Sequence, residues 1–428
     1  MQKISDKLIE LERPPITERA IVVRLALPED SDEEITESLE EMRRLAWTAG
    51  ADVALTVIQR RARPCPATLI GSGKVETLRK AVAELEADLV VIDSDLSPTQ
   101  GAKLADALNV KVVDRTQLIL DIFAQRARTN EGKHQVELAQ LQYALPRLTG
   151  RGVEMMRLGA GIGTRGPGEQ KLEVDRRVIR QRIDRLKSEL EAVRRHRRVQ
   201  RQRRVSGRVA SVALVGYTNA GKSSLLRALT GANVLIEDKL FATLDPTSRK
   251  VSLPSQREAV FTDTVGFIRK LPHSLVAAFR ATLEEVEEAD MLLLVADASH
   301  PASEEQIQAV NVVLDEIGAA DKPIILVYNK IDIADSDQVR GLLLGPRNAI
   351  GVSAVTGENL DALRERVDRA LASDRTRLRL RIPHGESALI ARIHDTGQVF
   401  AQRFEGDGVV LDAAVGPSLR ALVERYAE

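Results

Sequence analysis

The stretch A-S-V-A-L-V-G-Y-T-N-A-G-K-S-S, residues 210–224, decides the class of fold. Residues 210–215 form an apolar run that predicts a buried strand, and helix-like residues follow the loop at 224–227. The loop between them matches the phosphate-binding pattern G-x-x-x-x-G-K-[ST] in its required context of strand, loop and helix. The backbone N–H groups of such a loop and the positive end of the helix both attract phosphate. We therefore expect a nucleotide-binding α/β domain around this loop.

The residues of this loop have expected roles in phosphate and metal binding. Lys222 would reach the β- and γ-phosphates, and the Ser223 hydroxyl would ligate Mg²⁺. The expected phosphate-binding residues are Gly216, Tyr217, Thr218, Asn219, Ala220, Gly221, Lys222, Ser223 and Ser224.

Two segments downstream complete the phosphate end of the expected site. A short strand at 260–262 is followed by D-T-V-G, residues 263–266. Asp263 suits a second Mg²⁺ contact, and Gly266 can present its N–H to the γ-phosphate. The segment F-A-T-L-D-P-T, residues 241–247, lies in the interval expected for a mobile segment that covers the γ-phosphate. Thr243 is the expected Mg²⁺ ligand from it, and Thr247 is the alternative.

A buried strand followed by Asn-Lys-x-Asp, residues 324–332, predicts the choice of base. An ionised Asp332 can accept hydrogen bonds from guanine N1–H and from the 2-amino group. Adenine lacks both donors and would leave the carboxylate unpaired, at a cost of about 1–3 kcal/mol. Lys330 would lie along the base, and Asn329 would tie this loop to the phosphate loop. Backbone N–H groups for guanine O6 are expected from Ser353 and Ala354. The site is thus predicted to bind GTP rather than ATP.

The expected hydrolytic machinery lacks one common part. Many GTPases place a glutamine directly after Asp-x-x-Gly to orient the attacking water. Here that residue is Phe267, so we expect slow intrinsic turnover that a backbone group, an ion or a partner completes. Asn219 is a candidate ligand for a monovalent cation such as K⁺, and bracing of the loop is an equal alternative for it. The residues expected to serve catalysis are Lys222, Thr243, Gly266 and Asn219.

The rest of the chain predicts further domains, since 428 residues exceed one ordinary core. Strand-like runs near residues 20–25, 53–58, 88–92 and 110–113 alternate with helical patterns, which is typical of βαβ units and a parallel sheet. Two helical patterns, 136–148 and 172–199, flank a Gly- and Pro-rich loop at 159–169, which indicates a helical hairpin with this loop at its tip. The expected division is an N-terminal α/β domain at 1–126, a helical hairpin linker at 127–206, a Ras-like GTPase domain with a mostly parallel sheet at 207–373, and a small α+β appendage at 374–428.

Composition excludes several classes of protein. The single cysteine, Cys65, rules out an intramolecular disulfide framework, and the six histidines have no metal-ligand spacing, so no zinc site is expected. Apolar runs such as 291–295 are too short to cross a bilayer, and residues 1–6 are unlike a signal peptide. We therefore expect a cytoplasmic protein without a membrane span, and a monomer.

Charge is unevenly distributed although the net charge is zero. Residues 194–208 contain eight arginines and no acidic residue, which indicates a polyanion partner or a solvated helix face. The candidate RNA contacts are Arg165, Arg194, Arg195, Arg197, Arg198, Arg201, Arg203 and Arg204.

Beyond the nucleotide motifs, the chain resembles the HflX family of ribosome-associated GTPases, which is related to the Obg proteins. The resemblance rests on G-I-G-T-R-G-P-G-E at 161–169, L-E at 172–173 and D-R-R at 175–177, preceded by L-A-Q-L at 138–141 and L-T-G at 148–150. F-A-T-L-D at 241–245 and D-T-V-G-F-I at 263–268 match as well, and Gln170-Lys171 departs from the usual Thr-Gln. The resemblance implies binding to the large (50S) ribosomal subunit and its rRNA. It further implies that the GTP-bound form splits stalled or idle ribosomes, with the hairpin tip entering the peptidyl-transferase region.

Two other functions remain open from the sequence. G-S-G-K at 71–74 resembles a phosphate loop, although a turn before a helix is the preferred interpretation. If it does bind nucleotide, the chain is an RNA-remodelling protein with additional ATP activity in its N-terminal domain. Alternatively, the chain is a GTPase that regulates a protein complex without RNA, and the arginines merely face solvent.

Overall fold

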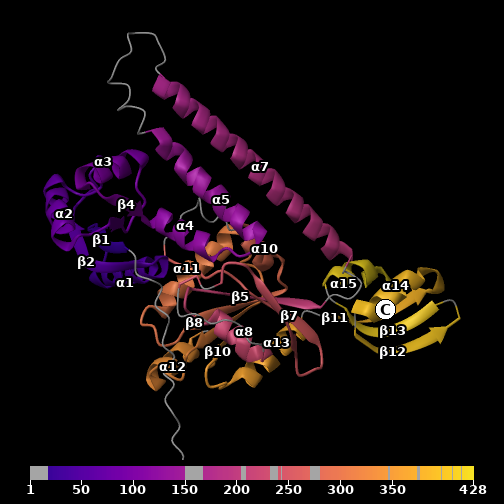
Figure 1. Cartoon of the computed structure of the whole chain (residues 1–428). Helices are drawn as coiled ribbons and strands as arrows, with labels where there is room; N and C mark the ends of the chain where they lie inside the picture. The colour runs from indigo at the N-terminus through magenta and orange to yellow at the C-terminus, as the bar shows by residue number, and fades with distance from the viewer. Residues whose placement is uncertain are drawn as a thin grey trace, which may run out of the picture. The chain divides into compact units, whose positions relative to one another are not determined.

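The computed structural model describes residues 18–149, 167–203, 209–231, 240–241, 243–269, 280–345, 348–373, 376–396, 398–406, 408–415 and 417–428. These residues belong to two compact units, whose boundary falls inside a long helix between Lys187 and Ser188. The units are described separately below (Figure 1). The division into four domains that is expected from the sequence stays a prediction.

The N-terminal part is a four-stranded parallel sheet with the order β2-β1-β3-β4, as the βαβ pattern predicts. Its elements are β1 (Glu18–Ala26), α1 (Asp32–Ala49), β2 (Ala51–Arg60), α2 (Ser72–Leu85), β3 (Leu89–Ile92), α3 (Pro98–Leu108), β4 (Lys111–Asp114) and α4 (Arg115–Arg126). Two helices begin with a capping box, in which Ser31 and Ser97 each bond a backbone N–H three residues on. These local signals and the apolar strands explain why the pattern was readable from the sequence.

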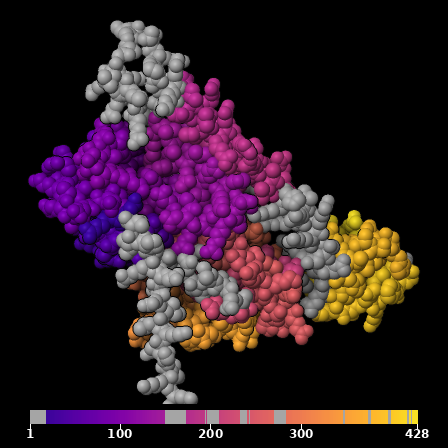
Figure 2. All heavy atoms as spheres, in the orientation of Figure 1, coloured from indigo at the N-terminus to yellow at the C-terminus, as the bar shows by residue number. Residues whose placement is uncertain are grey.

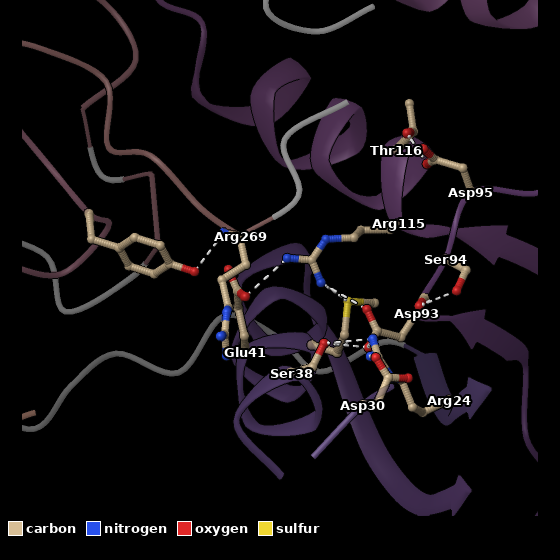
Figure 3. A network of polar contacts seen from close by, with 12 residues as sticks. Arg24, Asp30, Ser38, Glu41, Asp93, Ser94, Asp95, Arg115, Thr116 and Arg269 are labelled. Carbon is tan, nitrogen blue, oxygen red and sulfur yellow. Dashed lines mark hydrogen bonds and ion pairs between the residues drawn. The ribbon is translucent and has the colours of Figure 1, made fainter. Parts of the chain in front are cut away.

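A buried polar network lies at the carboxyl ends of β1 and β3 (Figure 3). Asp93, directly after β3, accepts from Arg24 of β1 at 2.7 Å and from Arg115 of α4 at 2.8 Å. Arg115 also bonds Glu41 of α1 at 3.0 Å, and the Ser38 hydroxyl donates to Asp93. All five side chains are buried. Because each charge faces an opposite charge, the network joins α1, β1, β3 and α4 inside one unit.

The helical hairpin consists of α5 (Asn130–Ala144), the short helix η1 (Leu145–Thr149) and α7 (Pro167–Arg203). Glu137 of α5 and Arg182 of α7 form two parallel hydrogen bonds of 2.7 Å. The predicted loop at 159–169 is wrong in its last three residues, because α7 already begins at Pro167. Proline fits the first helical position, where its missing N–H would have no partner in any case. The remaining loop residues, including Arg165, lie outside the described part of the chain.

The central domain is a six-stranded sheet with the order β10-β9-β8-β5-β7-β6, parallel except for β6. Its elements are β5 (Ala210–Gly216), α8 (Lys222–Thr230), β6 (Thr247–Ser252), β7 (Glu258–Asp263), α10 (Arg280–Glu288), β8 (Met291–Asp297), α11 (Ser303–Glu316), β9 (Ile324–Asn329), α12 (Ser336–Leu344), β10 (Ala349–Gly351) and α13 (Leu360–Ser373). Helices α8 and α13 pack onto one face through leucines such as Leu226 and Leu363. Strands β7 and β8 lie on opposite sides of β5, so the strand order reverses at β5. In sheets of this kind, ligands bind at the carboxyl ends of the strands where the order reverses.

The C-terminal residues form a three-stranded antiparallel sheet with the order β11-β13-β12. Its elements are β11 (Thr376–Pro383), η3 (His384–Glu386), α14 (Ser387–Thr396), β12 (Gln398–Glu405), β13 (Gly408–Val415), α15 (Pro417–Val423) and η4 (Glu424–Tyr426). Their atoms gather into one rounded body, yellow in Figure 2. This is the small α+β appendage that the sequence predicts. Across the described ranges, no helix is both long enough and apolar enough to span a membrane.

Candidate nucleotide-binding site

The phosphate loop leaves the carboxyl end of β5 and enters α8 at Lys222. Gly221 caps this helix without any side-chain bond, so the first N–H groups of α8 stay available for an anion. Gly221 has a φ of +90°, and a Cβ there would lie 2.2 Å from the Asn329 side-chain nitrogen. Only glycine satisfies both conditions. The loop borders a cavity of about 360 Å³, which is lined by Thr218, Asn219, Gly221, Lys222, Ser223, Ser224, Phe241, Thr243, Thr264, Gly266, Asn329, Lys330, Asp332, Ile333, Ala354 and Val355.

Lys222 is held in place by the loop that precedes it. Its Nζ donates to the carbonyl oxygens of Gly216 at 3.0 Å and Tyr217 at 2.8 Å. Burial lowers the pKa of Lys222 to about 8, against the opposing effect of the Asp263 charge. A phosphate beside the ammonium group would favour its charged form. The side chain is therefore positioned for an anion before any anion is bound.

Three oxygen-bearing side chains from separate elements meet at one point beside the loop. The Ser223 and Thr243 hydroxyls are 2.9 Å apart, and they donate to Asp263 Oδ2 at 2.6 and 2.8 Å. Neighbouring ligands in the octahedral shell of Mg²⁺, with a radius of about 2.1 Å, lie about 2.9–3.0 Å apart. The spacing of the two hydroxyls therefore fits Mg²⁺. Thr247, the alternative to Thr243, instead pairs with Asp263 in the sheet at the start of β6.

Asp263 is deeply buried, and its second oxygen supports the same interpretation. Burial raises the pKa of Asp263, while Lys222 and the bonds from Ser223 and Thr243 oppose this rise. Its Oδ1 has no hydrogen-bond partner in the structure, as expected for an atom that bonds a metal ion or its water. In the described ranges, no group of three or more His, Cys, Asp or Glu side chains has an arrangement that could hold a metal ion.

The segment after Asp263 runs directly alongside the phosphate loop. Phe267 N–H donates to the Gly216 carbonyl at 3.1 Å, and Thr218 N–H donates to the Phe267 carbonyl at 2.7 Å. A Cβ on Gly266 would lie 2.8 Å from Thr218 Cα and 2.9 Å from Lys222 Nζ. Glycine is thus required by the close approach of this segment to the loop. The predicted γ-phosphate contact, Gly266, sits next to the lysine expected to bind the same group.

The expected guanine end of the site is organised by Asn329, which is only 2% exposed. Its Nδ2 donates to the Ala220 carbonyl, and its Oδ1 accepts from Ala354 N–H, both at 3.0 Å. One amide therefore links the phosphate loop to the Ser353–Ala354 turn, while Asp332 and Lys330 line the same cavity. The Ala354 N–H, expected to contact guanine O6, is engaged by Asn329 in this structure.

Sequence reasoning missed one residue that supports the site, Asp297, and one contact of a predicted residue, the Tyr217 hydroxyl. Asp297, at the end of β8, accepts from Lys330 Nζ at 2.6 Å and so positions this lysine. Tyr217 OH accepts from the backbone N–H of Arg269 at 2.6 Å, which joins the loop to the segment beyond Phe267. Asp297 directly follows an apolar strand, and that position was the available signal. The tyrosine contact had no signal, because it depends on tertiary structure.

Other predicted sites are not part of this cavity. Gly71 caps α2, its N–H donates to Gln59 Oε1 at 2.9 Å, and Lys74 lies in the first helical turn. This geometry is that of a turn before a helix, and an ATP activity there stays an untested prediction.

Among the candidate RNA contacts, the Arg195 side chain is described and exposed. The side chains of Arg194, Arg197, Arg198, Arg201, Arg203 and Arg204 lie outside the described part of the chain.

Three family models match successive parts of the chain. Residues 36–124 match a model described as GTP-binding GTPase N-terminal, and residues 126–204 match the GTP-binding GTPase Middle Region. Residues 211–330 match a model described as 50S ribosome-binding GTPase. GTPase HflX from Caldanaerobacter subterraneus subsp. tengcongensis is 49% identical over 427 residues, which are 99% of this chain and 96% of that protein.

Two further relatives and one solved structure extend this comparison. GTPase HflX from Lacrimispora saccharolytica is 48% identical, over 99% of both chains. The Escherichia coli GTPase HflX is 42% identical, over 92% of both chains. A GTP-binding protein from Sulfolobus solfataricus in complex with GDP is 27% identical, covers 82% of this chain and 98% of its own, and has a TM-score of 0.43.

Proposed function

Because the chain belongs to the HflX family of GTPases, we propose that GTP controls its binding to the large ribosomal subunit and its splitting of stalled or idle ribosomes. The observation that carries this proposal is the match of residues 211–330 to the 50S ribosome-binding GTPase model. The arginine-rich sequence at 194–208 would supply positive charge for rRNA phosphates. The function would be exerted in the cytoplasm, where ribosomes are found, and by a monomer.

In the proposed complex, the loop at 216–224 surrounds the phosphates of GTP and Asp332 selects guanine. Lys222 neutralises the β- and γ-phosphates, and Asn329 holds the phosphate and base loops at a fixed distance. Lys330 presents its alkyl chain to the base while Asp297 fixes its ammonium group. The Ala354 N–H already donates to Asn329 Oδ1, so guanine O6 would have to share this donor with Asn329.

Ser223 and Thr243 would hold Mg²⁺ directly, and Asp263 would hold it through a water molecule. The ion would neutralise negative charge that develops on the β- and γ-phosphates. Asn219 is the proposed K⁺ ligand, since its exposed side chain lines the cavity from a left-handed backbone conformation with φ of +62°. Stimulation of GTP hydrolysis by K⁺ over Na⁺, and its loss in Asn219→Ala, would test this role.

The switch follows from the position of two segments beside the phosphate loop. The γ-phosphate would draw in Gly266 through its N–H and Thr243 through the Mg²⁺ site. Because Gly266 lies close to Thr218 and Lys222, this segment would have to adjust when a third phosphate enters. GTP and GDP would therefore leave the chain in different conformations, and hydrolysis would release the protein from the ribosome.

Co-sedimentation with 50S, 30S and 70S particles tests the proposal. The wild-type chain should pellet with 50S particles in the presence of a non-hydrolysable GTP analogue, and far less with GDP. With 70S particles, GTP should increase the fraction of separated subunits. A useful control is the Lys222→Ala chain, which should neither pellet with nor split ribosomes under these conditions. Equal association in GDP and the analogue, or no association with 50S, would refute the ribosomal function while leaving the GTPase intact.

A further inference from the structure

The residue that stands at the usual position of the water-orienting glutamine cannot perform that task. Phe267 is 3% exposed, and its backbone is fixed to the phosphate loop by hydrogen bonds on both sides. Its ring offers no strong donor or acceptor. Another group near the γ-phosphate must orient the attacking water if the chain itself is to catalyse hydrolysis.

The phosphate-loop residue that lies next to Phe267 is Thr218. It lines the cavity, is only 7% exposed, and its N–H donates to the Phe267 carbonyl at 2.7 Å. A Cβ on Gly266 would meet both Thr218 Cα and Thr218 Cγ2 at 2.8 Å. The threonine methyl group therefore lies against Gly266, at the end of the cavity proposed to hold the γ-phosphate.

The Thr218 hydroxyl differs in its bonding from the hydroxyls of Ser223, Thr243 and Thr264, which also line the cavity. Ser223 and Thr243 bond Asp263, and Thr264 donates to the Leu214 carbonyl at 2.7 Å. The Thr218 Oγ1 is shielded from solvent and has no hydrogen-bond partner in the structure. A buried hydroxyl without a partner is unfavourable by about 1–3 kcal/mol. Rotation of the side chain about χ1 would turn this hydroxyl toward the cavity that Thr218 lines, where a nucleotide and its attacking water can pair with it.

We propose that the Thr218 hydroxyl orients the attacking water in place of glutamine, an inference that rests on the proposed GTP site. It accepts a hydrogen bond from the water and donates one to a γ-phosphate oxygen. The water oxygen then bonds to the γ-phosphorus, and the bond from that phosphorus to the β,γ-bridging oxygen breaks. The electron pair stays on the β-phosphate, and the water proton passes to the γ-phosphate. Thr218 is unchanged at the end of the reaction, so it acts as a catalytic residue without a covalent intermediate.

The substitutions Thr218→Val and Thr218→Ser test this role, because valine keeps the shape and serine keeps the hydroxyl. Single-turnover hydrolysis of GTP should slow by about 10²-fold in Thr218→Val, the loss typical of one oriented donor. It should stay within about 3-fold of wild type in Thr218→Ser. GDP affinity should be within about 2-fold of wild type in both, since the phosphate contacts of the loop are backbone N–H groups.

Each contrary result has a distinct meaning. Equal hydrolysis by wild type and Thr218→Val would overturn the role of the hydroxyl. Loss of GDP affinity in Thr218→Val would also overturn it, because the side chain would then serve the shape of the loop. A weaker affinity for the GTP analogue with an unchanged rate would make the hydroxyl a ground-state ligand and not a catalytic residue. Absence of GTP binding by the wild-type chain would instead refute the proposed function itself.

Discussion

At the scale of single residues, Asp332 decides which base the site accepts. Its carboxylate lines the cavity beside Asn329 and Lys330, where two acceptor oxygens can pair with the N1–H and 2-amino donors of guanine. The Asp335 carboxylate, three residues further on, instead caps α12 by accepting from Asp337 and Gln338 N–H. The two aspartates thus offer a matched pair for mutation.

We predict that Asp332→Asn weakens GDP binding by at least about 100-fold, equivalent to about 2.7 kcal/mol. The amide replaces one acceptor by a donor, which suits the 2-oxo group of xanthine better than the 2-amino group of guanine. Xanthosine diphosphate should therefore bind this variant more tightly than GDP in a fluorescence titration. Asp335→Asn should leave GDP affinity unchanged, because asparagine caps helices as well as aspartate. Retained preference for GDP in Asp332→Asn would contradict the assignment.

Ser223 is the residue on which Mg²⁺ binding should depend most. Removing Mg²⁺ with a chelator should speed the release of GDP from the wild-type chain by more than about 10-fold. Ser223→Ala should release GDP quickly already, and a chelator should change its rate by less than about 2-fold. Ser252→Ala, which removes an exposed hydroxyl outside the cavity, is the control and should behave as wild type. A large chelator effect that persists in Ser223→Ala would place the ion elsewhere.

At the scale of secondary-structure elements, the buried network of the N-terminal unit joins α1, β1, β3 and α4. Its centre is Asp93, which faces both Arg24 and Arg115. The exposed pair of Arg79 and Glu76 on α2 has a similar distance of 2.7 Å but lies in solvent. Exposed pairs contribute about 0–1 kcal/mol, whereas removing one partner of a buried pair is unfavourable by about 3–5 kcal/mol.

We predict that Arg115→Met lowers the free energy of unfolding of the N-terminal unit by about 3–5 kcal/mol, because Asp93 would keep only Arg24 as its cationic partner and Glu41 would lose its pairing with Arg115. Trp47 is the single tryptophan of the chain and lies in α1, so its fluorescence in a urea titration reports this unit specifically. Arg79→Met should change the free energy of unfolding by less than about 0.5 kcal/mol. GDP affinity should be unaffected in both variants. A decrease below about 1 kcal/mol in Arg115→Met would show that the network is dispensable.

At the scale of the whole molecule, binding to rRNA through arginines would make affinity for 50S particles depend steeply on salt. Replacing Arg194, Arg195, Arg197 and Arg198 by glutamine should flatten the plot of log affinity against log salt by about 0.7–0.9 for each rRNA phosphate that is no longer neutralised. In a control variant, glutamine replaces four exposed basic residues of the N-terminal unit, so the same positive charge is removed. These residues are Arg43, Arg44, Arg79 and Lys80. An equal slope in the two variants would assign the effect to net charge and not to the arginine segment.

Much of the fold and part of the site could be predicted because the responsible signals are local. The strand, loop and helix at 210–224 are contiguous, and the motifs ending in Gly266 and Asp332 each follow an apolar strand. Capping serines at 31 and 97 mark the starts of two helices. The end of the hairpin loop was misjudged, since glycine and proline density suggested a longer loop while Pro167 serves as a helix start.

By itself, therefore, the sequence determined the class of fold, the nucleotide loop and the family, because backbone propensity, hydrophobic period and motif spacing act over short stretches. Tertiary structure decided the rest. Only folding brings the Thr243 and Ser223 hydroxyls to 2.9 Å across 20 residues, and Asn329 to the Ala220 carbonyl across 109 residues. The partnerless hydroxyl of Thr218 likewise depends on which segment packs beside it. Contacts of this kind depend on the order of strands in the sheet, which no local pattern encodes.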